Sequence, residues 1–359
     1  MPIPAEIHAL DTWLKGWLFD HALPLWWEVG ADRVKGGWFE KIGLDGTAVE
    51  GPRRARVAAR QTYVYAMAGR LGWGGPWREA MAHALAALLG PFAGEDGLFR
   101  MVTSPTGAPL DDRRDPYDQA FALLALASAQ EAGAGPQEDR ALAVLAAMET
   151  AGLLRADGAV LHEGVIKANP MMHLFEAAQA WARVGASGRW KALAEMIARA
   201  ALGRMIDLET GALGEILDGD WRPDPEADVE PGHQLEWGWL LLTQLGDSAP
   251  ARRLIEIGET RGVERGVVIF SLDRSLRPRD RSARLWAQTE RIHAHAVAGD
   301  WAGVLRGAEG LRPYLEVPAP GTWRDRLTPD GVFVEEPAPG SSLYHIVSAV
   351  MALDAARRG

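Results

Sequence analysis

The sequence predicts an all-α protein, an (α/α)6 barrel of six helical hairpins with short β-ribbons in its long loops. Twelve stretches rich in Ala, Leu and Glu recur along the 359 residues, separated by short Gly-, Asp- and Pro-containing connections. Near the start of alternate stretches, a polar or aromatic residue recurs at intervals of 57, 56, 60, 53 and 59 residues. These residues are Arg60, Tyr117, His173, His233, Trp286 and His345. A single hairpin cannot bury its apolar face alone, so six similar units closing into a ring are the simplest arrangement. We therefore expect residues 1–359 to form one domain.

The expected helices are joined by short turns within each hairpin and by longer, ribbon-containing loops between hairpins. The helices cover residues 5–20, 54–71, 76–90, 116–132, 136–150, 170–185, 188–204, 232–246, 249–261, 282–298, 301–313 and 341–357. Each expected ribbon combines a Gly turn with alternating apolar residues. The ribbons lie in residues 35–49, 95–100, 156–165, 209–221, 265–275 and 329–336. If alternate helices line the axis, the six recurring side chains converge on one funnel beneath these loops.

Composition narrows the function classes. Hydrophobic residues make up 48% and charged residues 24%, as in an ordinary globular protein. The net charge of −10 argues against a nucleic-acid partner or an anionic membrane, because both select for a basic face. The absence of cysteine excludes disulfides, zinc–thiolate sites and cysteine nucleophiles. With no signal-peptide pattern at the N-terminus and no run of about 18 apolar residues, we expect a cytoplasmic protein without a membrane span.

The stretch EPGHQLEWGWLLL at residues 230–242 carries the strongest chemical signal. Its Pro-Gly pair marks a loop that ends where an apolar helix begins. His233 and Glu236 are one helical turn apart and share a face. An imidazole and a carboxylate at a helix entrance suit a small polar ligand with exchangeable protons. The alternative is a buried pair that only holds the loop against the helix.

The stretch ANPMMHLFEA at residues 168–177 repeats this spacing with His173 and Glu176. We expect Asn169 to cap the helix, with Pro170 in its first turn. Two His-x-x-Glu turns raise the question of a metal, because di-iron helical bundles pair Glu and His at this spacing. Those sites use the reverse order and additional carboxylates, so we expect no metal.

Five further segments contribute candidate site residues. In SSLYHIVS, His345 lies on the first turn of the last helix, and an isolated histidine there would ordinarily be structural. Its match to the repeat favours a place in the funnel instead. We expect ligand contacts from the segments VAARQTYVY, DPYDQAF, RLWAQTE and TWRDR. Their candidate residues are Arg60, Tyr117, Trp286, Glu290, Trp323 and Asp325, although an Arg–Asp pair in a loop is often only a salt bridge.

Five of these motifs, ARQTYVY, NPMMHLFEA, EPGHQLEW, RLWAQTE and EEPAPGSSLYHI, resemble the N-acylglucosamine 2-epimerase superfamily in order from about residue 35 to the C-terminus. This superfamily includes N-acylglucosamine and cellobiose 2-epimerases, mannose and sulfoquinovose isomerases, and a type of mannose-6-phosphate isomerase. The resemblance implies an (α/α)6 barrel that needs no metal or cofactor for its chemistry, although some members bind ATP as an effector. It implies proton-transferring roles for His233 and His345, a third site histidine at His173, an arginine on the sugar oxygens at Arg60, and a supporting carboxylate at Glu236.

The motif ARQTYVY followed by AGRLGW, and the stretch DPYDQAFALLALA, most resemble the mannose and mannose-6-phosphate isomerase branch. We therefore expect an aldose–ketose isomerase that converts a mannose-type sugar into the fructose form through a cis-enediol. His233 and His345 would be the acid and base, in an order that the sequence leaves open. Glu176, Asn169 and Tyr117 would contact the substrate, with Trp286 and Trp323 as walls.

Other interpretations remain open at this level. A sugar 2-epimerase shares the same enediol, and differs only in the carbon that is reprotonated. A glycoside hydrolase or lyase would need two carboxylates flanking the glycosidic bond, and a sugar-binding barrel would need no proton shuttles. A phosphorylated sugar would need cations such as the Arg53/Arg54 or Arg113/Arg114 pairs. Because apolar outer faces of such barrels often self-associate, a homodimer is a further expectation.

Overall fold

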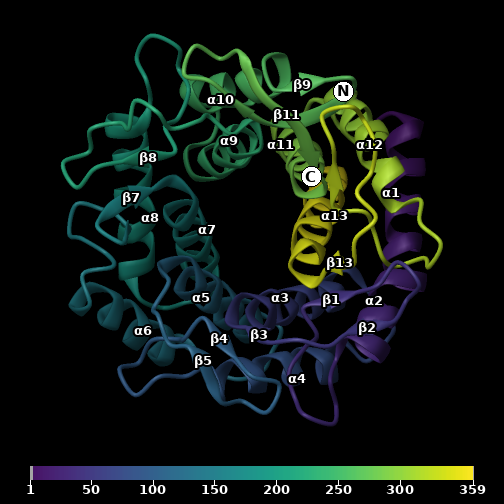
Figure 1. Ribbon diagram of the computed structural model, residues 1–359. Helices are drawn as coiled ribbons and strands as arrows, with labels where there is room; N and C mark the ends of the chain where they lie inside the picture. Colours follow the sequence, from purple (N-terminus) through teal and green to yellow (C-terminus); the bar gives the residue numbers. More distant parts are fainter. Residues whose placement is uncertain (1–2, 359) are drawn as a thin grey trace.

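A computed structural model describes residues 3–358 as a closed double ring of helices (Figure 1). The six inner helices lie side by side around the axis, and packing of the last against the first closes the ring. They are α3 (Ala55–Leu71), α5 (Pro116–Glu131), α7 (Ala168–Val184), α9 (Pro231–Leu245), α11 (Leu285–Ala298) and α13 (Leu343–Arg358). The outer helices are α1 (Ala5–Trp17), α4 (Trp77–Leu89), α6 (Glu138–Thr150), α8 (Gly188–Ala200), α10 (Ala249–Thr260) and α12 (Trp301–Leu315). The predicted (α/α)6 barrel is confirmed.

Burial patterns distinguish the two rings. The inner helix α5 is buried around most of its circumference, from Pro116 to Ala129, because it contacts inner neighbours on both sides and an outer helix behind. The outer helix α10 instead buries one stripe, which includes Ala251, Leu254, Ile255 and Gly258. The spacing of three and four residues along that stripe is typical of a helix with one face toward the core. The Ala- and Leu-rich inner sequences therefore reflect their double burial.

Several helix boundaries differ from the predicted ones. Helix α7 begins at Ala168 with Lys167 at its N-cap, so the expected cap at Asn169 is wrong, and Asn169 lies within the first turn. Helix α11 begins three residues later than predicted, because β11 continues to Arg284. After α1 the chain continues through two π-helical turns, Leu18–Ala22 and Trp26–Gly30, which flank the short α2 (Leu23–Leu25).

Four small antiparallel sheets lie where the chain enters the inner helices. Their orders are β13-β1-β2, β3-β4-β5, β6-β7-β8 and β12-β11-β10-β9. The strands are β1 (Lys41–Ile42), β2 (Ala48–Val49), β3 (Arg53–Arg54), β4 (Val102–Thr103), β5 (Pro109–Asp111), β6 (Leu161–His162), β7 (Val165–Lys167), β8 (Ile216–Leu217), β9 (Val263–Glu264), β10 (Val267–Leu272), β11 (Pro278–Arg284), β12 (Arg326–Leu327) and β13 (Ala338–Pro339). Strands β3, β7 and β11 run directly into α3, α7 and α11. Short ribbons are confirmed, although 95–100 and 329–336 contribute only isolated bridges.

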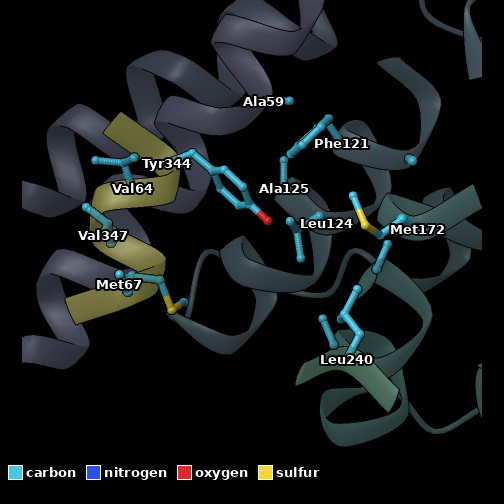
Figure 2. Packing of buried hydrophobic residues seen from close by; sticks show 14 of the residues in the cluster. Ala59, Val64, Met67, Phe121, Leu124, Ala125, Met172, Leu240, Tyr344 and Val347 are labelled. Atoms are coloured by element: carbon cyan, nitrogen blue, oxygen red, sulfur yellow. The ribbon is translucent and has the colours of Figure 1, made fainter. Parts of the chain in front are cut away.

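The middle of the barrel is filled by side chains from the inner helices. Tyr344 extends from α13 into the interior, in the same packed region as Phe121 and Leu124 of α5 (Figure 2). Its ring meets the edge of Phe121 at a centroid distance of 5.2 Å. This layer separates the two ends of the barrel. Within residues 3–358, no helix is both long and apolar enough to cross a membrane.

Candidate active site

The inner helices begin around a cavity of about 620 Å³. All six side chains of the sequence repeat line it: Arg60, Tyr117, His173, His233, Trp286 and His345. The predicted convergence on one funnel is therefore confirmed. Asn169 and Glu236 line the same cavity. Six helix N-termini directed toward one space favour negative charge there, because the free N–H groups of each first turn carry partial positive charge.

Two of the imidazoles are held by carboxylates at nearly equal distances. Nδ1 of His233 lies 2.8 Å from Oε2 of Glu215, and Nδ1 of His345 lies 2.7 Å from Oε1 of Glu290. Glu290 also accepts a hydrogen bond of 2.9 Å from the indole of Trp239. In both rings Nδ1 is occupied, so Nε2 remains for the cavity. A carboxylate on one ring nitrogen fixes the tautomer and orientation that present the other nitrogen to a substrate.

The protonation states of these two histidines differ. Burial alone would lower the pKa of His233, but the negative charges of Glu230 and Glu215 outweigh burial and raise that pKa to about 10. Burial lowers the pKa of His345 well below 6.5, and the guanidinium groups of Arg60 and Arg284 lower it further. At neutral pH, His233 is therefore a cation and His345 is a neutral base. Titratable groups whose pKa values are displaced in opposite directions form an acid–base pair.

His173 forms a third, more enclosed position. Its Nδ1 lies 3.3 Å from Glu176 and 3.8 Å from Glu236. Burial lowers its pKa to about 4, although the hydrogen bond to Glu176 acts in the opposite direction. Its ring meets the edge of Tyr117 at 5.1 Å. His173 is thus a neutral hydrogen-bonding group at neutral pH.

Arg60 supplies a positive charge among these rings. Its guanidinium donates to the carbonyl oxygen of Ser341 at 3.0 Å and to the hydroxyl of Tyr117 at 2.5 Å. It forms no ion pair with a carboxylate within residues 3–358. Its charge is therefore available to an oxygen of a ligand.

Glu236 lines the cavity with a buried, unsatisfied atom. Oε1 of Glu236 has no hydrogen-bond partner in the described part of the chain. Burial and the neighbouring Glu290 raise the pKa of this carboxyl well above its usual value. A neutral carboxyl group is both donor and acceptor, so a ligand hydroxyl would satisfy it.

Four predicted ligand contacts do not line this cavity. Trp323 is wholly buried and stacks on Trp26 at 5.2 Å, so the prediction that it forms a wall is wrong. Asp325 pairs with Arg284 at 2.7 Å and accepts a hydrogen bond from Ser342 at 2.8 Å. It therefore holds these two cavity-lining residues in place instead of contacting a ligand. Glu290 lies behind His345.

Glu176 is the fourth residue, and it faces the other end of the barrel. It points away from the funnel because it bridges two buried groups, the hydroxyl of Tyr344 and the ring of His173. Its predicted contact with the substrate is therefore replaced by a contact with a site histidine.

The mouth of the cavity carries arginines with carboxylate partners. Arg56 donates to Asp118 at 2.8 Å and Arg284 to Asp325, whereas the contact of Arg54 with Glu40 is longer, at 3.5 Å. Of the arginine pairs considered for a phosphate, only Arg54 lines the cavity. The others form ion pairs elsewhere: Arg53 with Asp32, Arg113 with Asp111, and Arg114 with Asp96.

Sequence reasoning missed Glu215, Glu230 and Arg284. Glu215 precedes β8, whose pairing with β7 brings it beside the start of α7, where its carbonyl accepts from the N–H of Ala168. Its carboxylate reaches His233 at the start of α9, so its role depends on a long-range register. Two clusters have ligand atoms within 4.8 Å of one another: Glu215, Glu230 and His233, and Glu236, Glu290 and His345. In both clusters the histidine Nδ1 already contacts a glutamate. A metal at Nδ1 would have to displace that contact.

This protein is an (α/α)6 barrel with a protonated and a neutral histidine around one polar cavity. Such a barrel can transfer protons to and from a small polar substrate. The profile of the N-acylglucosamine 2-epimerase (GlcNAc 2-epimerase) family matches residues 37–349, and the chain belongs to this family. It is 39% identical to a mannose-6-phosphate isomerase of Rhizobium meliloti (strain 1021), over 97% of this chain and 98% of that protein.

Solved structures agree on the fold. A crystal structure of D-mannose isomerase superimposes with a TM-score of 0.88 at 18% identity, covering 99% of this chain and 100% of the other. Cellobiose 2-epimerase from Bacillus thermoamylovorans B4167 gives 0.84 at 20% identity, covering 98% and 100%. The family and the relatives define an enzyme that isomerises or epimerises sugars.

Proposed function

We propose that this protein is an aldose–ketose isomerase that interconverts a mannose-type sugar with the fructose form by proton transfer through a cis-enediol. The observation that carries the proposal is the pair of histidines in one cavity with oppositely displaced pKa values. The name of the 39% identical relative supports the choice of a mannose-type sugar.

The reaction follows from these protonation states. Neutral His345 removes the proton from C2 of the open-chain aldose, and the C2–H electron pair forms the C1–C2 double bond of the enediol. Protonated His233 gives its proton to the O1 oxygen as the C1 carbonyl opens. His345 then returns its proton to C1, while His233 takes the O2 proton back and the C2 carbonyl forms. Both histidines end in their starting states, as general acid–base catalysis requires.

Arg60 and Glu236 complete the site in this proposal. The guanidinium of Arg60 stabilises the charge that develops on O1 and O2, in a cavity where little water screens it. Glu236 binds a sugar hydroxyl, which satisfies its unpartnered oxygen. Trp286 lies between the acid and the base, with ring centroids 5.3 Å from His233 and 5.7 Å from His345. Its indole forms a wall along the substrate.

Turnover in D2O tests the reaction. The protein is incubated separately with D-mannose, mannose 6-phosphate and N-acetylmannosamine, and products are examined by NMR. Deuterium at C1 of a fructose product is the expected result. Deuterium at C2 of the epimeric aldose, with no ketose formed, would replace the isomerase with a 2-epimerase, and no exchange with any of the three would contradict both.

The mouth of the cavity offers one place for a phosphate. Arg54 is about half exposed and only loosely paired with Glu40, so it is free to turn toward a 6-phosphate. Charge-assisted hydrogen bonds contribute about 1.5–3 kcal/mol, so Arg54→Gln should lower kcat/KM for mannose 6-phosphate by about tenfold or more. Turnover of D-mannose should stay unchanged. Equal losses on both sugars would exclude this contact.

We also propose that the reaction needs no metal ion. Neutral His345 and protonated His233 provide the base and the acid, and Arg60 provides the positive charge that a metal would otherwise supply. Dialysis against a chelator should leave kcat within error of the untreated enzyme. Loss of activity that Mn²⁺, Mg²⁺ or Zn²⁺ restores would show that one of the two glutamate–histidine clusters holds a metal.

A further inference from the structure

A second cavity, of about 540 Å³, lies at the opposite end of the barrel axis. It is lined by the last turns of the inner helices, including Arg70 of α3, Glu131 of α5, Arg183 of α7 and Thr243 of α9. The first turns of the same helices surround the active site, and the two cavities share no lining residue in the described part of the chain. Tyr344 belongs to the packed side chains in the barrel interior (Figure 2). The proposed reaction uses nothing in this second space.

Two aromatic rings that stack on each other contribute to the wall of the second cavity. Trp239 and His293 lie with ring centroids 3.8 Å apart and an interplanar angle of 13°, and both are more than nine-tenths buried. Nδ1 of His293 contacts the hydroxyl of Ser348 at 3.2 Å. The amide nitrogen of Gln179 donates to the carbonyl of Leu240 at 3.0 Å, so its amide oxygen is the group presented to the cavity. A cavity lined by aromatic side chains and a few placed polar groups is typical of a small-molecule site.

The charges around this cavity balance. Arg70 and Glu131 form an ion pair of 2.5 Å at the mouth. Arg183 and Glu176 add one positive and one negative group to the lining. The charges of these four side chains cancel, and hydroxyl groups of a ligand find donors and acceptors among the amide, hydroxyl and paired charged groups. Such a lining suits an uncharged ligand with several hydroxyls.

We propose that this second cavity binds a neutral monosaccharide, with C–H groups of the sugar against the accessible atoms of Trp239 and His293 and its hydroxyls on Gln179 and the Arg70–Glu131 pair. The C–H groups of a pyranose are apolar and suit aromatic neighbours, while its edge is ringed by hydroxyls. Binding at this site does not depend on the proposed isomerase reaction. The effect on catalysis, argued next, rests on that proposed function.

Two residues of the second cavity contact groups that hold the catalytic histidines. Glu176 lines the cavity and lies 3.3 Å from Nδ1 of His173. Trp239 donates through its indole to Glu290, the carboxylate that contacts His345. A sugar that shifts either side chain changes the position of an imidazole in the active site. Occupancy of the second cavity thus modulates turnover, and coupling free energies of this kind change affinity or rate by about fivefold or more.

The binding test uses equilibrium dialysis of radiolabelled D-fructose against concentrated protein. The native chain should bind two sugars and Ala352→Phe, which places a phenyl ring in the second cavity, should bind one. The matched control Ala182→Phe adds the same ring to an exposed position of α7 and should bind two. Ala356→Phe is a second filling variant at the same cavity, in case the first fails to fold. Equal numbers of sugars bound by the native chain and by both phenylalanine variants would overturn the site.

The kinetic test compares initial rates over a wide range of sugar concentration. The native enzyme should depart from a hyperbola by about fivefold at high sugar, whereas Ala352→Phe should give a simple hyperbola with kcat/KM unchanged at low sugar. A hyperbola for the native enzyme, with two sugars bound, would overturn the coupling. If the protein turns over none of the sugars, the isomerase proposal fails, while dialysis still decides the second site.

Discussion

The two histidine–glutamate pairs of the active site have nearly the same geometry and opposite protonation. His233 and His345 lie on either side of α11, and each contacts its glutamate at 2.8 or 2.7 Å. The difference comes from the groups around them. His233 faces the additional carboxylate of Glu230, whereas His345 faces the cations Arg60 and Arg284. The contact distance of a pair therefore does not decide its charge; the neighbouring charges do.

Removal of the neutral member should have the largest effect. His345→Ala deletes the proposed base, and we expect kcat to fall about a hundredfold or more, as is typical for loss of a general base. Deuterium exchange into the substrate should fall in parallel. His83→Ala is the matched control, because His83 contacts the carbonyl of Gly37 outside the active site. Near-native exchange in His345→Ala would assign the base to another group.

Glu215 should set the alkaline limit of activity. Glu215→Gln removes a negative charge from Nδ1 of His233, so the pKa of His233 should fall from about 10 toward its ordinary value. Activity requires the protonated form and is lost as pH rises through this pKa. Each unit of decrease costs about tenfold in protonated enzyme above the new pKa, so the alkaline limb of kcat/KM should move to lower pH. The rate near pH 6 should change little.

The control for this substitution is Glu209→Gln in the same loop, where the side chain is exposed. An unchanged alkaline limb in Glu215→Gln, or an equal displacement in the control, would show that Glu215 does not raise the pKa of His233. A loss of activity that is equal at all pH values would indicate a purely structural role.

The sequence predicted the ring and the funnel because both depend on periodicity. Burying the inner helices requires apolar residues on all sides, and a repeat of similar length brings the same position of each unit to the axis. The sequence could not predict that Trp323 stacks in the core or that Glu176 faces the other cavity. Helical phase alone does not show which residues the middle layer covers. Glu215 was not predicted because strand pairing, rather than helix spacing, determines its position.

Arg284 should set the acidic limit of activity. Arg284→Gln removes a cation that lowers the pKa of His345, so this pKa should rise toward 6.5 and the acid limb of kcat/KM should move to higher pH. The guanidinium is partly exposed and screened by solvent, so only a small displacement of the acid limb is expected. Arg281→Gln is the control, because Arg281 lies on the same strand but pairs with Glu264. An acid limb that moves to lower pH would reverse the proposed sign.

The smallest effect is expected for Glu236→Gln, and it tests why the two histidine–glutamate pairs stay different. An ionised Glu236 would bring negative charge to both histidines and draw the pKa of His345 upward toward that of His233. Burial and Glu290 instead keep this carboxyl neutral, because they raise its pKa well above its usual value. Glu236→Gln keeps the shape and the neutral donor and acceptor groups, so kcat should stay within about threefold at neutral pH. Glu236→Ala removes the hydrogen bond to the sugar, and a buried partner left unsatisfied costs about 1–3 kcal/mol, which corresponds to a rise in KM of about tenfold. If the glutamine variant instead loses activity as severely as His345→Ala, Glu236 carries a charge in the reaction, and the separation of the two histidines must have another cause.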